Sequence, residues 1–102
     1  MIDPPVVKSF VILGLTRSGR VFRPSDWAER LCGVLAAFRP PASGAAATQS
    51  WSPYAVPGLH EGVRCVSIDA RLHDLEPLAY RFAASFAADN DLQIAPPDEE
   101  PR

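Results

Sequence analysis

The segment that decides the fold is SFVILGLT, residues Ser9–Thr16. It is apolar at consecutive positions, rich in β-branched and aromatic residues, and short for a helix. A strand that is apolar on both faces belongs in the middle of a sheet. The segment therefore predicts a buried central strand, in which Gly14 indicates a bulge or a close backbone approach.

A turn and a second strand are expected directly after this segment. The residues RSG (17–19) have the composition of a turn, and Gly19 can adopt the positive φ that many turns require. The residues RVF (20–22) then predict a short strand that pairs back as a hairpin. Pro24 is expected to end that strand.

The first helix has the clearest periodicity in the chain. Ser25 is its expected N-cap, or Asp26 is, with Glu29 reaching back in a capping box. The prolines at 40–41 are expected to stop the helix. Apolar residues at helical spacing predict one buried face: Trp27, Leu31, Val34, Leu35 and Phe38.

The second half of the chain predicts two strands and a helix. WSPYAVPG (51–58) is interrupted by prolines and can only be an edge strand, whereas VRCVSIDARL (63–72) predicts a regular strand. A helix is expected from about Asp74 to a left-handed cap at Asn90, and LQI (92–94) is expected to fold back on the body. The expected buried stripe of this helix is Leu75, Leu78, Phe82 and Phe86.

These elements predict an α+β fold, a two-layer sandwich in the order β-β-α-(β)-β-α. A mostly antiparallel sheet of three or four strands would be covered on one face by two helices. We expect a single domain at residues 9–94 after an extended lead-in at 1–8. Residues 40–50 predict a mobile loop, and residues 95–102 predict a disordered acidic, proline-rich tail.

The composition is typical of a soluble globular protein, with 47% hydrophobic and 22% charged residues. The longest apolar run is far shorter than the roughly 20 residues of a membrane span, and no signal peptide is evident, so a cytoplasmic location is expected. Residues 1–52 carry six basic and three acidic groups, whereas residues 53–102 carry four basic and nine acidic groups. A chain whose positive and negative charges are separated in this way could attract an anion at one end, or a second copy head to tail.

Residue types that support catalysis are sparse. His60 and His73 have no helical metal-site partner, and together with Cys32 and Cys65 they match no zinc spacing. We therefore expect no catalytic residue, metal or cofactor. Cys32 lies inside the first helix and is expected to be a packed thiol rather than a nucleophile.

Four arginines and a serine form the candidate anion- or partner-binding group: Arg17, Arg20, Arg23, Ser25 and Arg30. At the start of the first helix, arginines could hold an anion beside free N–H groups, although the Asp26 carboxylate would compete for the same groups. The same arginines could contact nucleic acid, an interpretation that the acidic balance of the chain disfavours.

Trp51 and Tyr54 form the second candidate surface. Their irregular, proline-rich segment could simply cover the edge of the sheet. It could equally bind an unknown protein partner or a second copy of the chain, since an uncovered edge strand invites pairing.

Two motifs resemble a known family. T-x-x-G-x-x-F-R-P-S-D-W-A-E-R-L-C-G (16–33) resembles the signature of a small proteobacterial family of unknown function. P-x-A-Y-R-F…F-A-x-D-N (77–90) is similar to the second helix of that family, and the resemblance covers about residues 8–94. It implies a stand-alone cytoplasmic bacterial domain with no assigned activity. The chain is thus expected to be a non-enzymatic protein-interaction module, with an anion-binding domain or a small nucleic-acid-binding protein as the alternatives.

Overall fold

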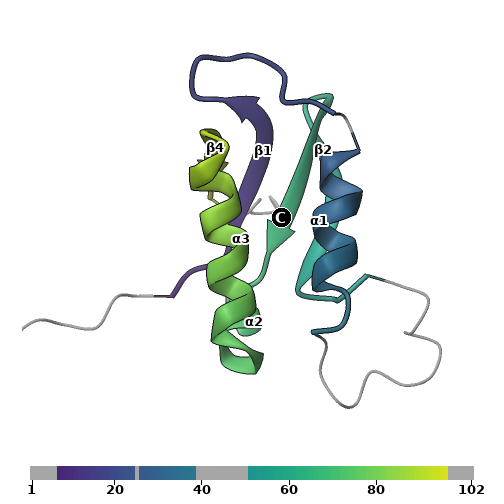
Figure 1. The fold of residues 1–102 in the computed structure, drawn as a ribbon, viewed down its shortest axis with the longest axis vertical. Coiled ribbons are helices and arrows are strands. Elements are labelled where there is room, and N and C mark those ends of the chain that lie inside the picture. The colour runs from purple at the N-terminus through teal and green to yellow at the C-terminus, as the bar shows by residue number, and fades with distance from the viewer. Residues whose placement is uncertain (1–6, 25, 39–50, 97–102) are drawn as a thin grey trace, which may run out of the picture.

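The computed structural model describes residues 7–24, 26–38 and 51–96. Four strands form one sheet in the order β2-β3-β1-β4, and every neighbouring pair is antiparallel. The helices α1 and α3 run alongside each other over one face of this sheet (Figure 1). The predicted α+β two-layer sandwich is therefore confirmed. In chain order the elements are β1 (Phe10–Thr16), α1 (Trp27–Leu35), β2 (Ala55–His60), β3 (Val63–Ile68), α2 (Arg71–Leu75), α3 (Pro77–Asp89) and β4 (Leu92–Ala95).

The central position of β1 is confirmed, because it pairs with β3 on one side and with β4 on the other. Its Ile12 is completely buried beneath the helices. The close approach predicted at Gly14 is also present. A β-carbon built there would lie 2.9 Å from the Arg64 carbonyl oxygen and 2.9 Å from Trp27 Nε1.

The turn after β1 is confirmed, but the predicted second strand is wrong. Gly19 has a φ of 89°, and its N–H donates to the Thr16 carbonyl at 2.8 Å. Residues 20–22 return beside β1 only through an isolated bridge between Leu15 and Val21. Because β3 and β4 already pair with most of β1, too little of it remains to support another strand.

The helix α1 begins as expected, but without the predicted capping box. Asp26 occupies the N-cap position and makes no side-chain capping bond; its carboxylate accepts from Arg30 Nε at 2.9 Å. Glu29 reaches across to Arg64 of β3 instead of back to the cap. The helix ends at Leu35, with Ala36 as its C-cap, so the predicted stop at residues 39–41 is wrong. Ser25 lies outside the described residues.

The buried face of α1 is slightly rotated from the predicted one. Trp27, Leu31 and Leu35 are buried as expected, and Cys32 is buried with them. Val34, however, is 58% exposed. It lies on the flank of α1 that faces α3, away from the sheet.

The edge-strand prediction for the proline-rich segment is confirmed by β2, which pairs only with β3. The strand β3 ends at Ile68, four residues before the predicted end at Leu72. The chain turns there because the Asp69 carboxylate accepts from the Arg71 backbone N–H at 2.9 Å, and α2 follows.

The predicted helix start near Asp74 is wrong. Glu76 has extended backbone angles that separate α2 from α3, as expected for a residue that precedes a proline. Its carboxylate accepts from the Leu78 N–H at 3.3 Å, so Glu76 is the N-cap and Pro77 is the first helical residue.

The buried face of α3 also differs from the prediction. Alanines contact the core: Ala79, Ala83 and Ala87 are buried. The predicted stripe residues Leu78 and Phe82 are 67% and 45% exposed. A face of alanines lets the helix lie close to the sheet, and the larger side chains are left on its flanks.

The end of α3 is followed by a strand that extends the sheet. The left-handed residue is Asp91, with a φ of 57°, and not the predicted Asn90, whose φ is −102°. The segment expected only to fold back is β4, an edge strand that pairs with β1. It reaches Ala95, one residue into the expected tail. The predictions for the loop at 40–50 and for the end of the tail fall outside the described residues.

We predict that Gly14→Ala lowers the free energy of unfolding by about 1–3 kcal/mol, since the added methyl group must displace Trp27 or the β3 backbone. Gly33→Ala is the matched control: a β-carbon at Gly33 meets nothing within 4 Å, and alanine favours a helix by about 0.5–1 kcal/mol. Urea denaturation of both variants checks this. Equal effects of the two substitutions would contradict the close contact.

Candidate functional site

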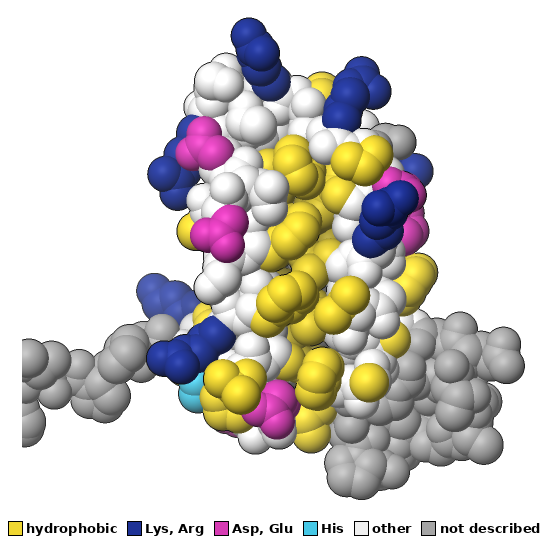
Figure 2. Space-filling model, in the orientation of Figure 1, with side chains coloured by type: hydrophobic (Ala, Val, Ile, Leu, Met, Phe, Trp, Pro, Cys, Tyr) yellow, Lys and Arg dark blue, Asp and Glu magenta, His cyan; other side chains and the backbone are white. Residues whose placement is uncertain are grey.

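An apolar groove runs between α1 and α3. Figure 2 shows hydrophobic side chains in a continuous band along this face of the molecule. Two adjoining hollows of about 250 and 360 Å³ form the groove, and both include Val34 and Phe82. We call it the α1/α3 groove. Its apolar lining comprises Phe22, Pro24, Trp27, Leu31, Val34, Leu35, Phe38, Leu78, Ala79, Phe82 and Phe86.

The floor of the smaller hollow is an aromatic cluster. The rings of Trp27 and Phe86 are stacked, with centroids 5.9 Å apart and planes inclined by 17°. The ring centroids of Phe22 and Trp27 lie 5.7 Å apart in an edge-to-face arrangement. Trp27 is only 3% exposed and packs against the sheet at Gly14, so this floor is held firmly in place.

The walls of the groove are exposed. Val34 projects from α1, and Leu78 and Phe82 project from α3. Large apolar side chains that stand singly on a surface need no explanation, but these share one continuous hollow. Their shared hollow makes this groove a candidate binding surface.

The two ends of the groove carry opposite charges. Arg30 lines the smaller hollow, and the exposed Arg23 lies in the chain between two of its lining residues. Glu76 lines the larger hollow, and the exposed Asp74 precedes it by two positions. Arg30 is paired with Asp26 at 2.9 Å, whereas Arg23, Asp74 and Glu76 form no ion pair within the described part of the chain.

The predicted arginine group is spread over different surfaces. Arg17 is 3.5 Å from the Asp91 carboxylate and lines a separate hollow between α3 and β4, whereas Arg30 lines the α1/α3 groove. Arg20 lies exposed in the turn after β1, and Arg23 lies near the groove. Arg17 and Arg30 therefore do not share a site. Anion binding by this group stays a prediction, and Ser25 lies outside the described residues.

The hollow between α3 and β4, at about 470 Å³, is larger than either hollow of the groove alone, but its Ser9, Arg17 and Tyr80 side chains are engaged locally. The Tyr80 hydroxyl donates to the Lys8 carbonyl at 2.7 Å, and Arg17 is paired with Asp91. It therefore offers little to orient a ligand. For this reason the α1/α3 groove is the stronger candidate.

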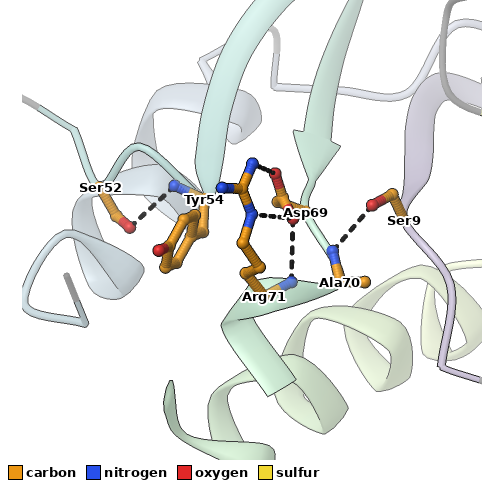
Figure 3. A network of polar contacts seen from close by, with 6 residues as sticks. All are labelled: Ser9, Ser52, Tyr54, Asp69, Ala70 and Arg71. Carbon is orange, nitrogen blue, oxygen red and sulfur yellow. Dashed lines mark hydrogen bonds and ion pairs between the residues drawn. The ribbon is translucent and has the colours of Figure 1, made fainter. Parts of the chain in front are cut away.

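The other predicted surface, Trp51 and Tyr54, contributes one exposed residue and one packed residue. Trp51 is 39% exposed. Tyr54 packs against the hydrophobic core, and the guanidinium of Arg71 lies 5.4 Å from its ring centroid (Figure 3). Tyr54 thus holds the start of β2 against α2.

A polar network beside Tyr54 was not predicted. Ser52 is completely buried; its hydroxyl donates to the Phe38 carbonyl at 2.7 Å and accepts from the Tyr54 N–H at 3.1 Å. Burial alone would raise the pKa of Asp69, but hydrogen bonds from Arg71 lower it below its usual value. A serine among prolines carries no sequence signal for burial, so Ser52 could be found only from the fold.

The packed thiol predicted at Cys32 is present. Burial, with smaller contributions from the nearby Glu29 and Cys65, raises its pKa to about 12. Cys32 is therefore a neutral thiol at physiological pH and a poor nucleophile. Among residues 7–24, 26–38 and 51–96, no group of three or more His, Cys, Asp or Glu side chains is placed to hold a metal ion. In the same ranges, no helix has the length and hydrophobicity to cross a membrane.

Comparisons with known proteins identify the family. The family model described as "Protein of unknown function (DUF3579)" matches residues 6–96. The chain belongs to this family. The resemblance to a family of unknown function is thereby confirmed.

One solved structure also resembles this DUF3579 chain. It is described as the solution structure of the first structural representative of its family, and it is 38% identical in sequence with a TM-score of 0.70. The match covers 93% of this chain and 83% of the other. No curated protein matches. Neither description names an activity or a ligand, so function must be inferred from the geometry of this DUF3579 domain.

For this DUF3579 chain we predict a stability loss at alkaline pH that depends on Cys32. Below about pH 9 the thiol is protonated in both the folded and unfolded states. Between 9.0 and about 12 it ionises only in the unfolded state, so the free energy of unfolding falls as pH rises, by up to about 1.4 kcal/mol per pH unit.

Urea titrations at pH 8 to 10 on wild type and Cys32→Ala measure this effect. The alanine variant should have lower stability at every pH but a shallower decline, because only the Cys32 contribution is removed. Parallel declines in the two proteins would contradict it.

Proposed function

We propose that this chain is a protein-interaction module that acts by binding rather than by catalysis, and that the α1/α3 groove is its binding surface. The observation that carries the proposal is the exposed apolar lining: Val34, Leu78 and Phe82 stand in one groove above a fixed aromatic floor. Covering this lining would return about 25 cal/mol for each Å² of apolar surface removed from water.

The shape of the groove suits helical partners. Two neighbouring helices leave a channel into which the side chains of a third helix can insert, as in other helix-in-groove complexes. Binding to such a groove requires little rearrangement where its floor is already packed, as it is around Trp27.

The chemistry of the lining supports binding more than catalysis. Of the described residues that line the groove, Arg30 and Glu76 are the ionisable ones. Arg30 is paired with Asp26, and Glu76 caps α3. Both are therefore suited to orienting a charged partner rather than to transferring protons in a reaction.

A photo-crosslinking experiment tests the proposal. A photoreactive phenylalanine analogue at position 82 should give discrete protein adducts in the cells that make the chain, because Phe82 lies at the centre of the groove. The same analogue at Glu61, an exposed turn residue with a φ of 53°, should give none. Equal adducts at both positions, or none at position 82, would refute the groove as the binding surface.

A second substitution separates the groove from general surface hydrophobicity. Val34→Asp should abolish the adducts from position 82, since it places a charge in the shared centre of both hollows. Val56→Asp is the matched control, a change at another exposed valine that lies in β2 and outside the groove. It should leave the adducts unchanged, and circular dichroism should show both variants folded.

A further inference from the structure

We infer that the occupant of the α1/α3 groove is the same groove of a second copy, with the two chains related by a two-fold axis. The inference rests on the proposed function, because it names the partner of that binding surface. In this arrangement α1 and α3 of one copy lie antiparallel to α1 and α3 of the other.

Charge is the first argument. Arg30 lines one end of the groove and is paired with Asp26, and Arg23 directly precedes the lining residue Pro24 at that end. Glu76 lines the other end, and Asp74 lies two positions before it. The net charge of these residues is therefore positive at the first end and negative at the second. A two-fold axis that crosses the middle of the groove at right angles, in the plane between the two copies, turns the second copy end for end. Each basic end then faces an acidic end, and the favourable contact occurs twice.

The position of the exposed apolar residues is the second argument. Val34 and Phe82 belong to both hollows and therefore mark the middle of the groove, where the axis would pass. There the same residues of two copies meet, as a two-fold interface requires. Leu78 lies toward the acidic end and would reach the opposite copy's aromatic floor at its basic end.

The alternative self-contact, through the sheet edge at β2, is less suitable. Pro57 lies within this strand and has no N–H to donate, and Gly58 follows it. The segment around Trp51 and Tyr54 is the other expected dimer contact. Tyr54 contributes little to such a contact, because it packs inward against the core. The two helices, by contrast, present their exposed apolar flanks on one open face (Figures 1 and 2).

A charge exchange tests the pairing. Arg30→Glu and Glu76→Arg, each alone, place like charges opposite one another and should weaken self-association on the order of tenfold or more. The double variant exchanges both ends, so opposite charges face each other again and association should recover. Sedimentation velocity across a concentration series, on the full chain, measures all three.

Controls separate association from folding. Glu76→Gln keeps an oxygen that can cap α3 but removes the charge, so it should weaken association less than Glu76→Arg while leaving the helix intact. Phe82→Asp should give a folded monomer, whereas Val56→Asp should associate like the wild type. Thermal melts followed by circular dichroism confirm that each variant is folded.

The inference is overturned by a wild-type chain that stays monomeric at millimolar concentration, or by a dimer that Phe82→Asp and the charge exchange leave unchanged. The proposed function fails separately. Adducts from position 82 to a different protein, with the purified chain monomeric, would retain the interaction module and remove the second copy as its partner. No adduct of any kind would remove both.

Discussion

The contact between Trp27 and Gly14 is the constraint on which the rest of the structure depends. The indole approaches the central strand so closely that a single methyl group at position 14 would collide with it and with the neighbouring β3 backbone. Because Trp27 is the first residue of α1, this contact fixes where the helix starts and how it lies on the sheet. Phe22 and Phe86 then pack around the same indole and join the turn after β1 to α3.

The α1/α3 groove follows from the way α3 is seated. Three alanines face the sheet and bring the helix backbone close to it. The larger residues Leu78 and Phe82 consequently project from the flank of α3 beside α1, and not into the space between α3 and the sheet. A helix that buried Leu78 and Phe82 would stand farther from the sheet and would leave no apolar lining exposed. The apolar surface of this chain is thus a product of close packing.

The parts of the fold that were predicted correctly depend on local chemistry. A strand that is apolar on both faces, a glycine with positive φ and a proline-rich edge strand can each be recognised from a few consecutive residues. The errors arose where neighbours compete. Residues 20–22 have the composition of a strand, but most of β1 already pairs with other strands. Glu76 is extended because Pro77 follows it. On α3, the stripe through Leu78 and Phe82 and the stripe through Ala79 and Ala83 have the same spacing, so periodicity alone could not choose between them.

The hydroxyl of Ser52 has a consequence for the connection between α1 and β2. It bonds to the Phe38 carbonyl and to the Tyr54 amide, so the two ends of residues 39–50 are joined by one side chain inside the folded body. One side chain therefore holds Phe38 and Tyr54, which are sixteen positions apart in the chain, in fixed places relative to each other.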